Sequence, residues 1–304
     1  MPAIPPFFVL TDNADNFTIA PGLLDTLPGG LLALAGNDTI TGSNLADIVQ
    51  GNKGDDRLIL GKGDDTIFGG AGNDTIAGEQ GQDFISGDLG DDIIYGGSIN
   101  NQVPDLADII YGGEGNDTIF GQEGNDFLNG NQGNDYLTGG AGNDTIRGGK
   151  GGDVLLGDQG SDTLIGDLGQ DALVGGIADA GAVDVDVFIL RGDAGANKLA
   201  QADLILDFSV GDKIGITNFK GGIGSLALQE FVPIPVSQFI TQLSPELQAA
   251  QKSGLINLND LAFNGLIQGT AISLTVNGPV IGVVLNQSLV QVNAALFNTN
   301  ITEA

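Results

Sequence analysis

The residues with the clearest chemical potential in this chain are aspartates that recur every nine positions. They stand at positions 38, 47, 56, 65, 74, 83 and 92 and, after an insertion, at 108, 117, 126, 135, 144, 153, 162 and 171. A last member, Asp186, follows a second insertion. Stacked carboxylates cannot all stay ionised cheaply unless a cation lies between them. The pattern therefore favours metal binding over acid–base catalysis.

The residues around each aspartate are equally regular. The residue two positions later is apolar in all sixteen cases, and the residue two positions earlier is glycine in thirteen of them. Leu45, Leu106 and Asp184 replace that glycine, the last two beside the insertions. An apolar residue at so strict a period predicts a buried column of side chains in a repeat architecture.

The elements that position these residues are short strands separated by glycine-rich turns. Three residues centred on the apolar one suit a strand whose middle side chain points inward. The other six suit a turn through backbone conformations that most residues avoid. Two such units form one flattened coil, and coils stacked at about 4.8 Å bury their few apolar side chains against one another. We therefore expect an all-β solenoid of parallel strands.

Stacking places the aspartates of every second turn above one another on one edge. Glycine turns add carbonyl oxygens, so carboxylates and carbonyls together form an all-oxygen cage of about six ligands, which suits Ca²⁺ better than Mg²⁺. Folding and metal loading are expected to be one event, because the empty cages are not preformed. The alternative, a calcium-free solenoid with surface aspartates, leaves the stacked carboxylates uncompensated.

The repeats "GGAGNDTIA", "GGEGNDTIF" and "GGAGNDTIR" resemble the G-G-x-G-x-D-x-U-x nonapeptide of the RTX family. The resemblance covers residues 36 to about 190. It implies a right-handed parallel β-roll in which calcium lies between adjacent turns, with roughly ten to thirteen ions in all. About twelve ions would bring a charge close to the formal net charge of −29 in magnitude.

The resemblance also implies two sets of calcium ligands. The carboxylates are Asp38, Asp56, Asp65, Asp74, Asp83, Asp92, Asp108, Asp117, Asp126, Asp135, Asp144, Asp153, Asp162 and Asp171. Asp47 is an exception, because its turn has leucine where the glycine belongs. The backbone carbonyls are those of Gly69, Ala71, Asn73, Gly112, Glu114, Asn116, Gly121, Glu123, Asn125, Gly130, Gln132, Asn134, Gly139, Ala141 and Asn143.

Composition excludes several other chemistries. The chain has no histidine and no cysteine, so it lacks the usual zinc site, the Ser-His-Asp triad and a cysteine nucleophile. Acidic residues outnumber basic ones 39 to 10, which makes nucleic acid an unexpected partner. No stretch reaches the length of a membrane-spanning helix. The first residues show neither the basic region nor the apolar run of a cleaved signal peptide.

Three segments are expected along the chain. Residues 1–32 cap the solenoid, residues 33–192 form the β-roll, and residues 193–304 form a small β-rich cap. In the last segment "ADLILDFSVGDKIGI" resembles the sequence that closes RTX rolls, where Asp203 and Asp207 either bind a last calcium or cap the stack. "SPELQAAQKSG" predicts a helix, and the residues around Asn277–Gly278 predict a hairpin.

The expected function is that of a secreted bacterial calcium-binding protein with a structural, adhesive or surface-associated role, and not an enzyme. Beyond residue 254 only Asp260 and Glu303 are charged, which resembles the uncleaved signal of type I secretion and makes that machinery an expected partner. The main alternative is an RTX-type extracellular hydrolase or epimerase with a carboxylate-only site in the C-terminal region. The segment before the repeats is too short for a catalytic domain, and an ice-binding array or a pore-forming toxin is disfavoured.

Aromatic side chains flank the inward column and are expected on the outer faces. They are Phe68, Phe84, Tyr95, Tyr111, Phe120, Phe127 and Tyr136. They predict either a strip that binds a cell-surface polysaccharide, another surface or another copy of the chain, or simply residues that suit strands.

Overall fold

The computed structural model describes most of the repeat region and parts of the C-terminal region. The described residues are 7–25, 27–99, 105–176, 184–191, 203–208, 212–217, 227–230, 234–235, 243, 245–253, 266–267, 269–273, 280–285 and 296–298. The chain divides into two compact units, residues 1–145 and 146–304. Both units consist mainly of β-strands.

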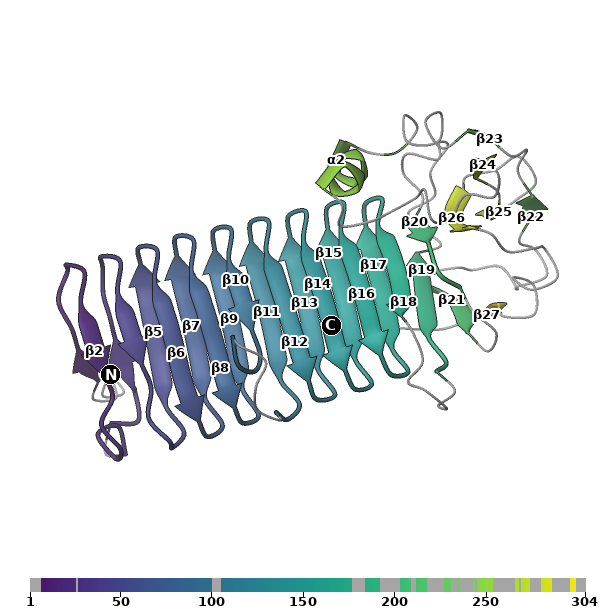
Figure 1. The fold of residues 1–304 in the computed structure, drawn as a ribbon. Coiled ribbons are helices and arrows are strands. Elements are labelled where there is room, and N and C mark those ends of the chain that lie inside the picture. Colours follow the sequence, from purple (N-terminus) through teal and green to yellow (C-terminus); the bar gives the residue numbers. More distant parts are fainter. Residues whose placement is uncertain are drawn as a thin grey trace, which may run out of the picture. The chain divides into compact units, whose positions relative to one another are not determined.

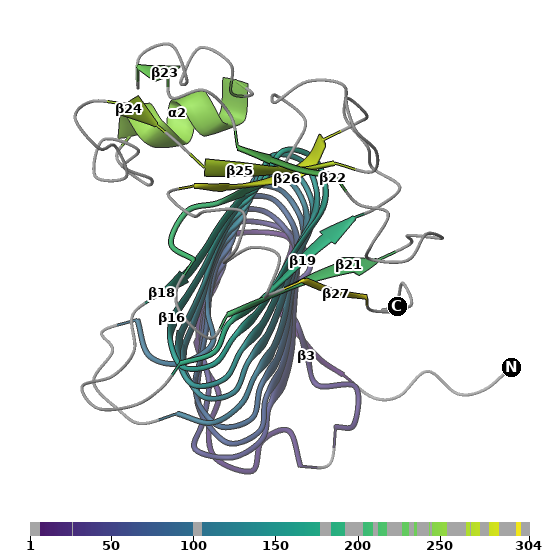
Figure 2. The same cartoon turned by 90° about the vertical axis from the view of Figure 1, so that its right-hand side faces the viewer.

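The first unit contains two parallel sheets that take alternate strands of the chain. One sheet has the order β1 (Phe8–Val9), β3 (Leu31–Leu32), β5 (Ile48–Lys53), β7 (Thr66–Ala71), β9 (Phe84–Leu89), β11 (Ile109–Glu114) and β13 (Phe127–Gln132). The other has the order β2 (Asn16–Thr18), β4 (Thr39–Thr41), β6 (Arg57–Lys62), β8 (Thr75–Gln80), β10 (Ile93–Tyr95), β12 (Thr118–Glu123) and β14 (Tyr136–Ala141). Figure 1 shows these strands side by side, and Figure 2 shows their coils as flattened loops.

The pairing register follows from the nonapeptide period. In β5 and β7, Val49 lies beside Ile67, eighteen residues later in the chain. Two repeats therefore make one coil, as the sequence predicts. All sixteen apolar residues of the predicted column, from Ile40 to Phe188, have an exposed fraction of 0%. The predicted all-β parallel β-roll is thus the fold of the repeat region.

The strands are longer than the three residues predicted. Most run for six residues, because strand pairing continues past the first glycine of the repeat: Asn52 lies beside Gly70, and Lys53 beside Ala71. The second turn position has a positive φ, 74° at Asn52 and 114° at Gly70. This conformation bends the chain at the edge of the roll. The backbone groups beyond the bend still pair with the neighbouring coil, so the prediction of strand length was wrong.

The segment that precedes the repeats extends both sheets of the first unit. Strand β1 pairs in parallel with β3, and β2 pairs in parallel with β4. The rings of Phe8 and Phe17 stack with their centroids 4.9 Å apart. The N-terminal residues therefore contribute strands of their own to the roll.

The second unit contains the end of the repeat region. Its strands are β16 (Val154–Gln159), β18 (Ala172–Gly176), β20 (Asp203–Ile205), β26 (Val280–Leu285), β25 (Gly269–Ser273) and β22 (Ala227–Glu230) in one sheet, and β17 (Thr163–Leu168), β19 (Val187–Arg191), β21 (Lys213–Thr217) and β27 (Leu296–Asn298) in the other. Strand β15 (Thr145–Lys150) begins at the boundary between the units, and β23 (Ile234–Pro235) pairs with β24 (Leu266–Ile267).

Two local predictions for the C-terminal region can be compared with the structure. Helix α2 covers Pro245–Ser253, as the sequence predicts. Strands β25 and β26 pair antiparallel on either side of the predicted hairpin turn. Ser244, Gly254 and the Asn277–Gly278 turn lie outside the described residues, as does most of the predicted secretion signal. Within the described part of the chain, no helix is long and apolar enough to cross a membrane.

The predicted outward aromatic residues lie half-buried on the sheet faces and contact one another. Phe68, Phe84, Tyr111 and Phe127 form a ladder across β7, β9, β11 and β13, with successive ring centroids 5.9, 5.8 and 5.9 Å apart. On the other sheet the rings of Tyr95 and Phe120 stack at 4.9 Å. Ring-to-ring packing of this kind stabilises a sheet face, so the binding strip stays a prediction.

Candidate metal sites

The repeat aspartates form two ladders in the first unit, one along each edge of the roll. Each aspartate directly precedes a strand, and its side chain lies over the coil before it. Asp74 shows the pattern: its Oδ1 accepts the backbone N–H of Asp56 at 2.7 Å, and its own N–H donates to Asp92 Oδ1 at 2.7 Å. On the other edge, the N–H of Asp108 donates to Asp126 Oδ1 at 2.8 Å. One carboxylate oxygen per coil thus holds adjacent coils in register.

The second carboxylate oxygen has a different environment. The repeat aspartates from Asp38 to Asp171 have exposed fractions of 3% or less. Among them, Oδ2 is inaccessible to solvent and has no hydrogen-bond partner in Asp38, Asp56, Asp65, Asp74, Asp83, Asp92, Asp108, Asp117 and Asp126. A buried acceptor without a donor costs about 1–3 kcal/mol, and more when it is charged. A row of such oxygens is therefore destabilising unless cations bind to them.

A glycine provides the space beside most of these oxygens. At Gly121, five residues before Asp126, a Cβ would lie 2.5 Å from Asp126 Oδ2 and 2.6 Å from the carbonyl oxygen of Gly139, one coil later. No side chain fits there, so a carboxylate oxygen and a carbonyl oxygen face one small space beside the first glycine of the repeat. We call this space the glycine cradle of the aspartate. The turns before Asp38 and Asp65 depart from this pattern, because the fully buried Ala33 and Leu60 take the glycine's place.

The same convergence recurs along both edges. The carbonyls of Gly69, Gly112, Gly121, Gly130 and Gly139 lie next to the glycine cradles of Asp56, Asp92, Asp108, Asp117 and Asp126, respectively. All five carbonyls were predicted as ligands from the family resemblance. The structure brings each of them together with a predicted carboxylate.

Other predicted carbonyls have additional roles. The carbonyl oxygens of Ala71, Glu114, Gln132 and Ala141 accept N–H groups of glycines in the preceding coil at 2.8–2.9 Å. Each keeps a second lone pair. At the position of Asn73, Asn116, Asn125, Asn134 and Asn143 the side chains form an outer ladder; Asn116 Oδ1, for example, accepts the N–H of Asn134 at 2.9 Å. These contacts strengthen the turns, and their donors do not reach the bare Oδ2 atoms.

Electrostatics supports the need for a cation. Burial raises the pKa of Asp108 to about 9, with added contributions from the negative charges of Asp105, Asp126 and Asp83. Burial likewise raises the pKa of Asp65, Asp92 and Asp126 to about 8, against the backbone hydrogen bond that lowers it in each case. Ionised carboxylates in these positions therefore destabilise the metal-free fold.

Asp47 differs from the other repeat aspartates, as its irregular turn indicates. Its Oδ2 accepts the N–H of Ser43 at 2.7 Å, within the turn that lacks the glycine. Its N–H still donates to Asp65 Oδ1 at 2.7 Å, so Asp47 keeps its place in the ladder. Its second oxygen is used by the turn itself.

The second unit continues the pattern beyond the repeats. Asp171 and Asp186 donate their N–H groups to Asp203 Oδ1 at 3.3 Å and Asp212 Oδ1 at 3.0 Å. Burial and the adjacent Asp203 raise the pKa of Asp171. Asp207, by contrast, accepts the N–H groups of Gly175 and Gly176, each at 2.7 Å. Asp203 thus occupies a ladder position, whereas Asp207 caps backbone donors.

Sequence reasoning missed Asp212 and the first member of the ladder, Asp15. Asp15 donates its N–H to Asp38 Oδ1 at 2.7 Å. For Asp212 the signal was present, because Ile214 follows it by two residues and is buried, as in every repeat. Asp15 is also followed at that spacing by an apolar residue, Phe17, but no glycine-rich turn precedes Asp15 in the sequence.

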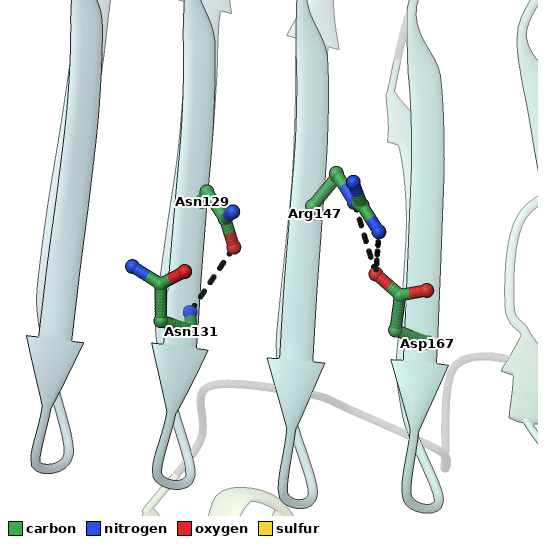
Figure 3. Close-up of polar contacts among 4 residues, drawn as sticks. All are labelled: Asn129, Asn131, Arg147 and Asp167. Atoms are coloured by element: carbon green, nitrogen blue, oxygen red, sulfur yellow. Dashed lines mark hydrogen bonds and ion pairs between the residues drawn. The ribbon is translucent and has the colours of Figure 1, made fainter. Parts of the chain in front are cut away.

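Side chains near the second turn position are held by local contacts (Figure 3). Asn131, with a φ of 72°, donates its N–H to Asn129 Oδ1 at 3.1 Å. Asp167, with a φ of 68°, accepts from Nε and Nη2 of Arg147 at 3.0 and 2.8 Å. Asp167 is therefore compensated by a cationic side chain on the sheet, and it does not need a metal ion.

The donor set fits calcium. In the described residues no three acidic side chains converge on one point, so a bound ion must take most of its ligands from the backbone. Carboxylate and carbonyl oxygens in flexible numbers are what Ca²⁺ accepts. In each cradle, one carboxylate oxygen without a hydrogen-bond partner lies beside a carbonyl oxygen. These two oxygens can serve as the first ligands of a bound Ca²⁺ ion.

A parallel β-roll with a buried aspartate in each repeat, and a glycine beside most of these aspartates, defines the class: a calcium-binding repeat protein. The family model of the RTX calcium-binding nonapeptide repeat matches the chain in four copies, at residues 41–76, 68–103, 105–137 and 138–173. Over residues 41–173 the chain therefore carries the RTX calcium-binding nonapeptide repeat, which confirms the resemblance seen in the sequence. A search of curated proteins found no match to the chain.

Proposed function

We propose that this protein is a secreted calcium-binding β-roll that folds as it loads with roughly ten to thirteen Ca²⁺ ions outside the cell. The observation that carries the proposal is the row of buried Asp Oδ2 atoms without hydrogen-bond partners, most of them beside a glycine cradle. The ions would be held by these carboxylates and by turn carbonyls such as that of Gly139. Calcium supplies the positive charge that lets the buried carboxylates stay ionised.

Export in an unfolded form follows from the same chemistry. Cytosolic calcium is too scarce to fill weak sites, whereas extracellular calcium reaches the concentrations that such modules need. An apolar C-terminal stretch with few charges is consistent with type I secretion. The location we propose is therefore extracellular or on the cell surface.

The role that we propose outside the cell is structural, adhesive or surface-associated, and not enzymatic. The repeat aspartates hold the backbone through Oδ1 and face the cradles through Oδ2, so they serve the fold. Cell-surface polysaccharide or another copy of the chain are the partners proposed for the outer faces. A hydrolase screen would support the enzyme alternative if an activity were lost on mutation of acidic residues in the C-terminal region alone.

Calcium loading can be tested by counting ions and following structure together. Native mass spectrometry gives the number of bound ions, and far-UV circular dichroism at the same free calcium gives the β-content. We expect both to rise in the same concentration range. A chain with full β-content and no bound ion would contradict the proposal.

A further inference from the structure

The first stretched turn, between β10 and β11, is closed by a side chain. In regular turns the N–H of the glycine two residues before the aspartate donates to a main-chain carbonyl one coil later, as from Gly63 to Gln80 at 2.8 Å and from Gly72 to Leu89 at 2.9 Å. Gly81 instead donates to Asp105 Oδ1 at 3.0 Å. The carboxylate of Asp105 therefore takes the place of the carbonyl that the insertion displaces.

The second stretched turn, in the second unit, uses the same type of residue. Gly160, the equivalent glycine, lies with its N–H 3.5 Å from Asp184 Oδ2. An aspartate side chain thus meets the equivalent N–H at both insertions. At the first insertion, however, the second carboxylate oxygen is left over.

That leftover oxygen, Asp105 Oδ2, faces another acceptor. Asp105 Oδ2 and Gln122 Oε1 are both inaccessible to solvent and have no hydrogen-bond partner. A Cβ on Gly97 would contact Asp105 Oδ2 and would lie 2.9 Å from Gln122 Oε1, so both oxygens border the same small space. The amide of Gln122 is oriented by its Nε2, which donates to the carbonyl of Ser98 at 2.8 Å. Its oxygen, not its nitrogen, therefore faces Asp105.

Two acceptors that face one space without a donor are stable only with a cation or a donor molecule between them. The surroundings are negative as well, because Glu123 and Glu79 lie nearby. Burial and these two charges raise the pKa of Asp105. We propose that Asp105 Oδ2 and Gln122 Oε1 bind an additional Ca²⁺ ion at this stretched turn, outside the ligand scheme of the nonapeptide. Carboxylate and amide oxygens are both common ligands of Ca²⁺. This inference rests on the proposed calcium loading.

The test is the number and affinity of calcium ions bound by the full chain. Asp105→Asn keeps the shape of the side chain and its Oδ1 acceptor but removes the charge. We expect this variant to bind one ion fewer than the wild type by native mass spectrometry. Glu79→Gln is the matched control, since it removes the same charge from another carboxylate near Asp105, and it should bind the wild-type number. An unchanged ion count in Asp105→Asn would overturn the inference.

A second variant keeps the test decisive if Asp105→Asn does not fold. Gln122→Glu places a second carboxylate beside Asp105. With an ion between them, the calcium concentration at half-loading should fall relative to the wild type; without one, repulsion should raise it, which would overturn the inference. A wild-type chain that binds no calcium would instead contradict the proposed function itself, so the two failures are distinguishable.

Discussion

At the scale of single residues, each repeat aspartate uses its two oxygens differently. Oδ1 of Asp126 accepts the N–H of Asp108 at 2.8 Å and holds the register of the coils. Oδ2 of Asp126 is buried without a donor, beside the carbonyl of Gly139. The first function needs only an acceptor, whereas the second needs a negative charge. Substitutions can therefore separate them.

Asp126→Asn should have opposite effects with and without calcium. The amide keeps the Oδ1 acceptor and can turn its NH₂ group toward the carbonyl of Gly139. In saturating calcium we expect one ion fewer and a loss of up to about 2.7 kcal/mol, the linkage energy at a hundred times the dissociation constant. In chelator the variant should fold more readily, by about 1–3 kcal/mol, because a bare charged acceptor is removed.

Urea unfolding in calcium measures the first effect, and osmolyte-induced folding in chelator measures the second. Asp126→Ala is the comparison, since it removes both oxygens and should destabilise the fold in both conditions. If Asp126→Asn destabilised the chain equally in calcium and in chelator, Oδ2 would have no role in binding a cation.

At the scale of strands, the outer faces contribute stability through rings. Tyr111 in β11 contacts both Phe84 and Phe127. Such ring pairs contribute about 0.5–1.5 kcal/mol each beyond area burial. We expect Tyr111→Ala to lower the free energy of unfolding in calcium by about 1–3 kcal/mol from these contacts, without changing the number of bound ions.

Gln50→Ala is the control for this prediction, because Gln50 lies outward on β5 in the same sheet, opposite Phe68 in register. It should change the unfolding free energy by less than about 0.5 kcal/mol. If fully folded Tyr111→Ala bound fewer calcium ions than the wild type, the prediction would be contradicted, and the aromatic face would be coupled to the metal sites.

The sequence predicts the strand period, the inward column and the aspartate edges, because each depends on residue type at a fixed spacing. It did not predict the length of the strands, since pairing beyond Asn52 depends on how a positive φ directs the backbone groups. Nor did it predict the role of Asp105, which lies at the end of an insertion with no repeat to compare it with. Ladder partners such as Asp15 arise from tertiary stacking and leave no glycine turn in the sequence.

At the scale of the whole molecule, charge decides when the chain folds. The formal net charge is −29, and buried carboxylates along both edges concentrate part of that charge inside the fold. Apolar burial in a narrow column must work against this repulsion. Calcium compensates the charge at the places where it is buried, so we expect loading and folding to be coupled.

The most direct test of this coupling is small-angle X-ray scattering of the full chain in chelator and in millimolar calcium. We expect an expanded chain in chelator, with a radius of gyration near the roughly 60 Å of an unfolded chain of this length, and a compact particle in calcium. Magnesium at the same concentration should leave the chain expanded. A chain equally compact in chelator and in calcium would contradict the claim that cations close the roll.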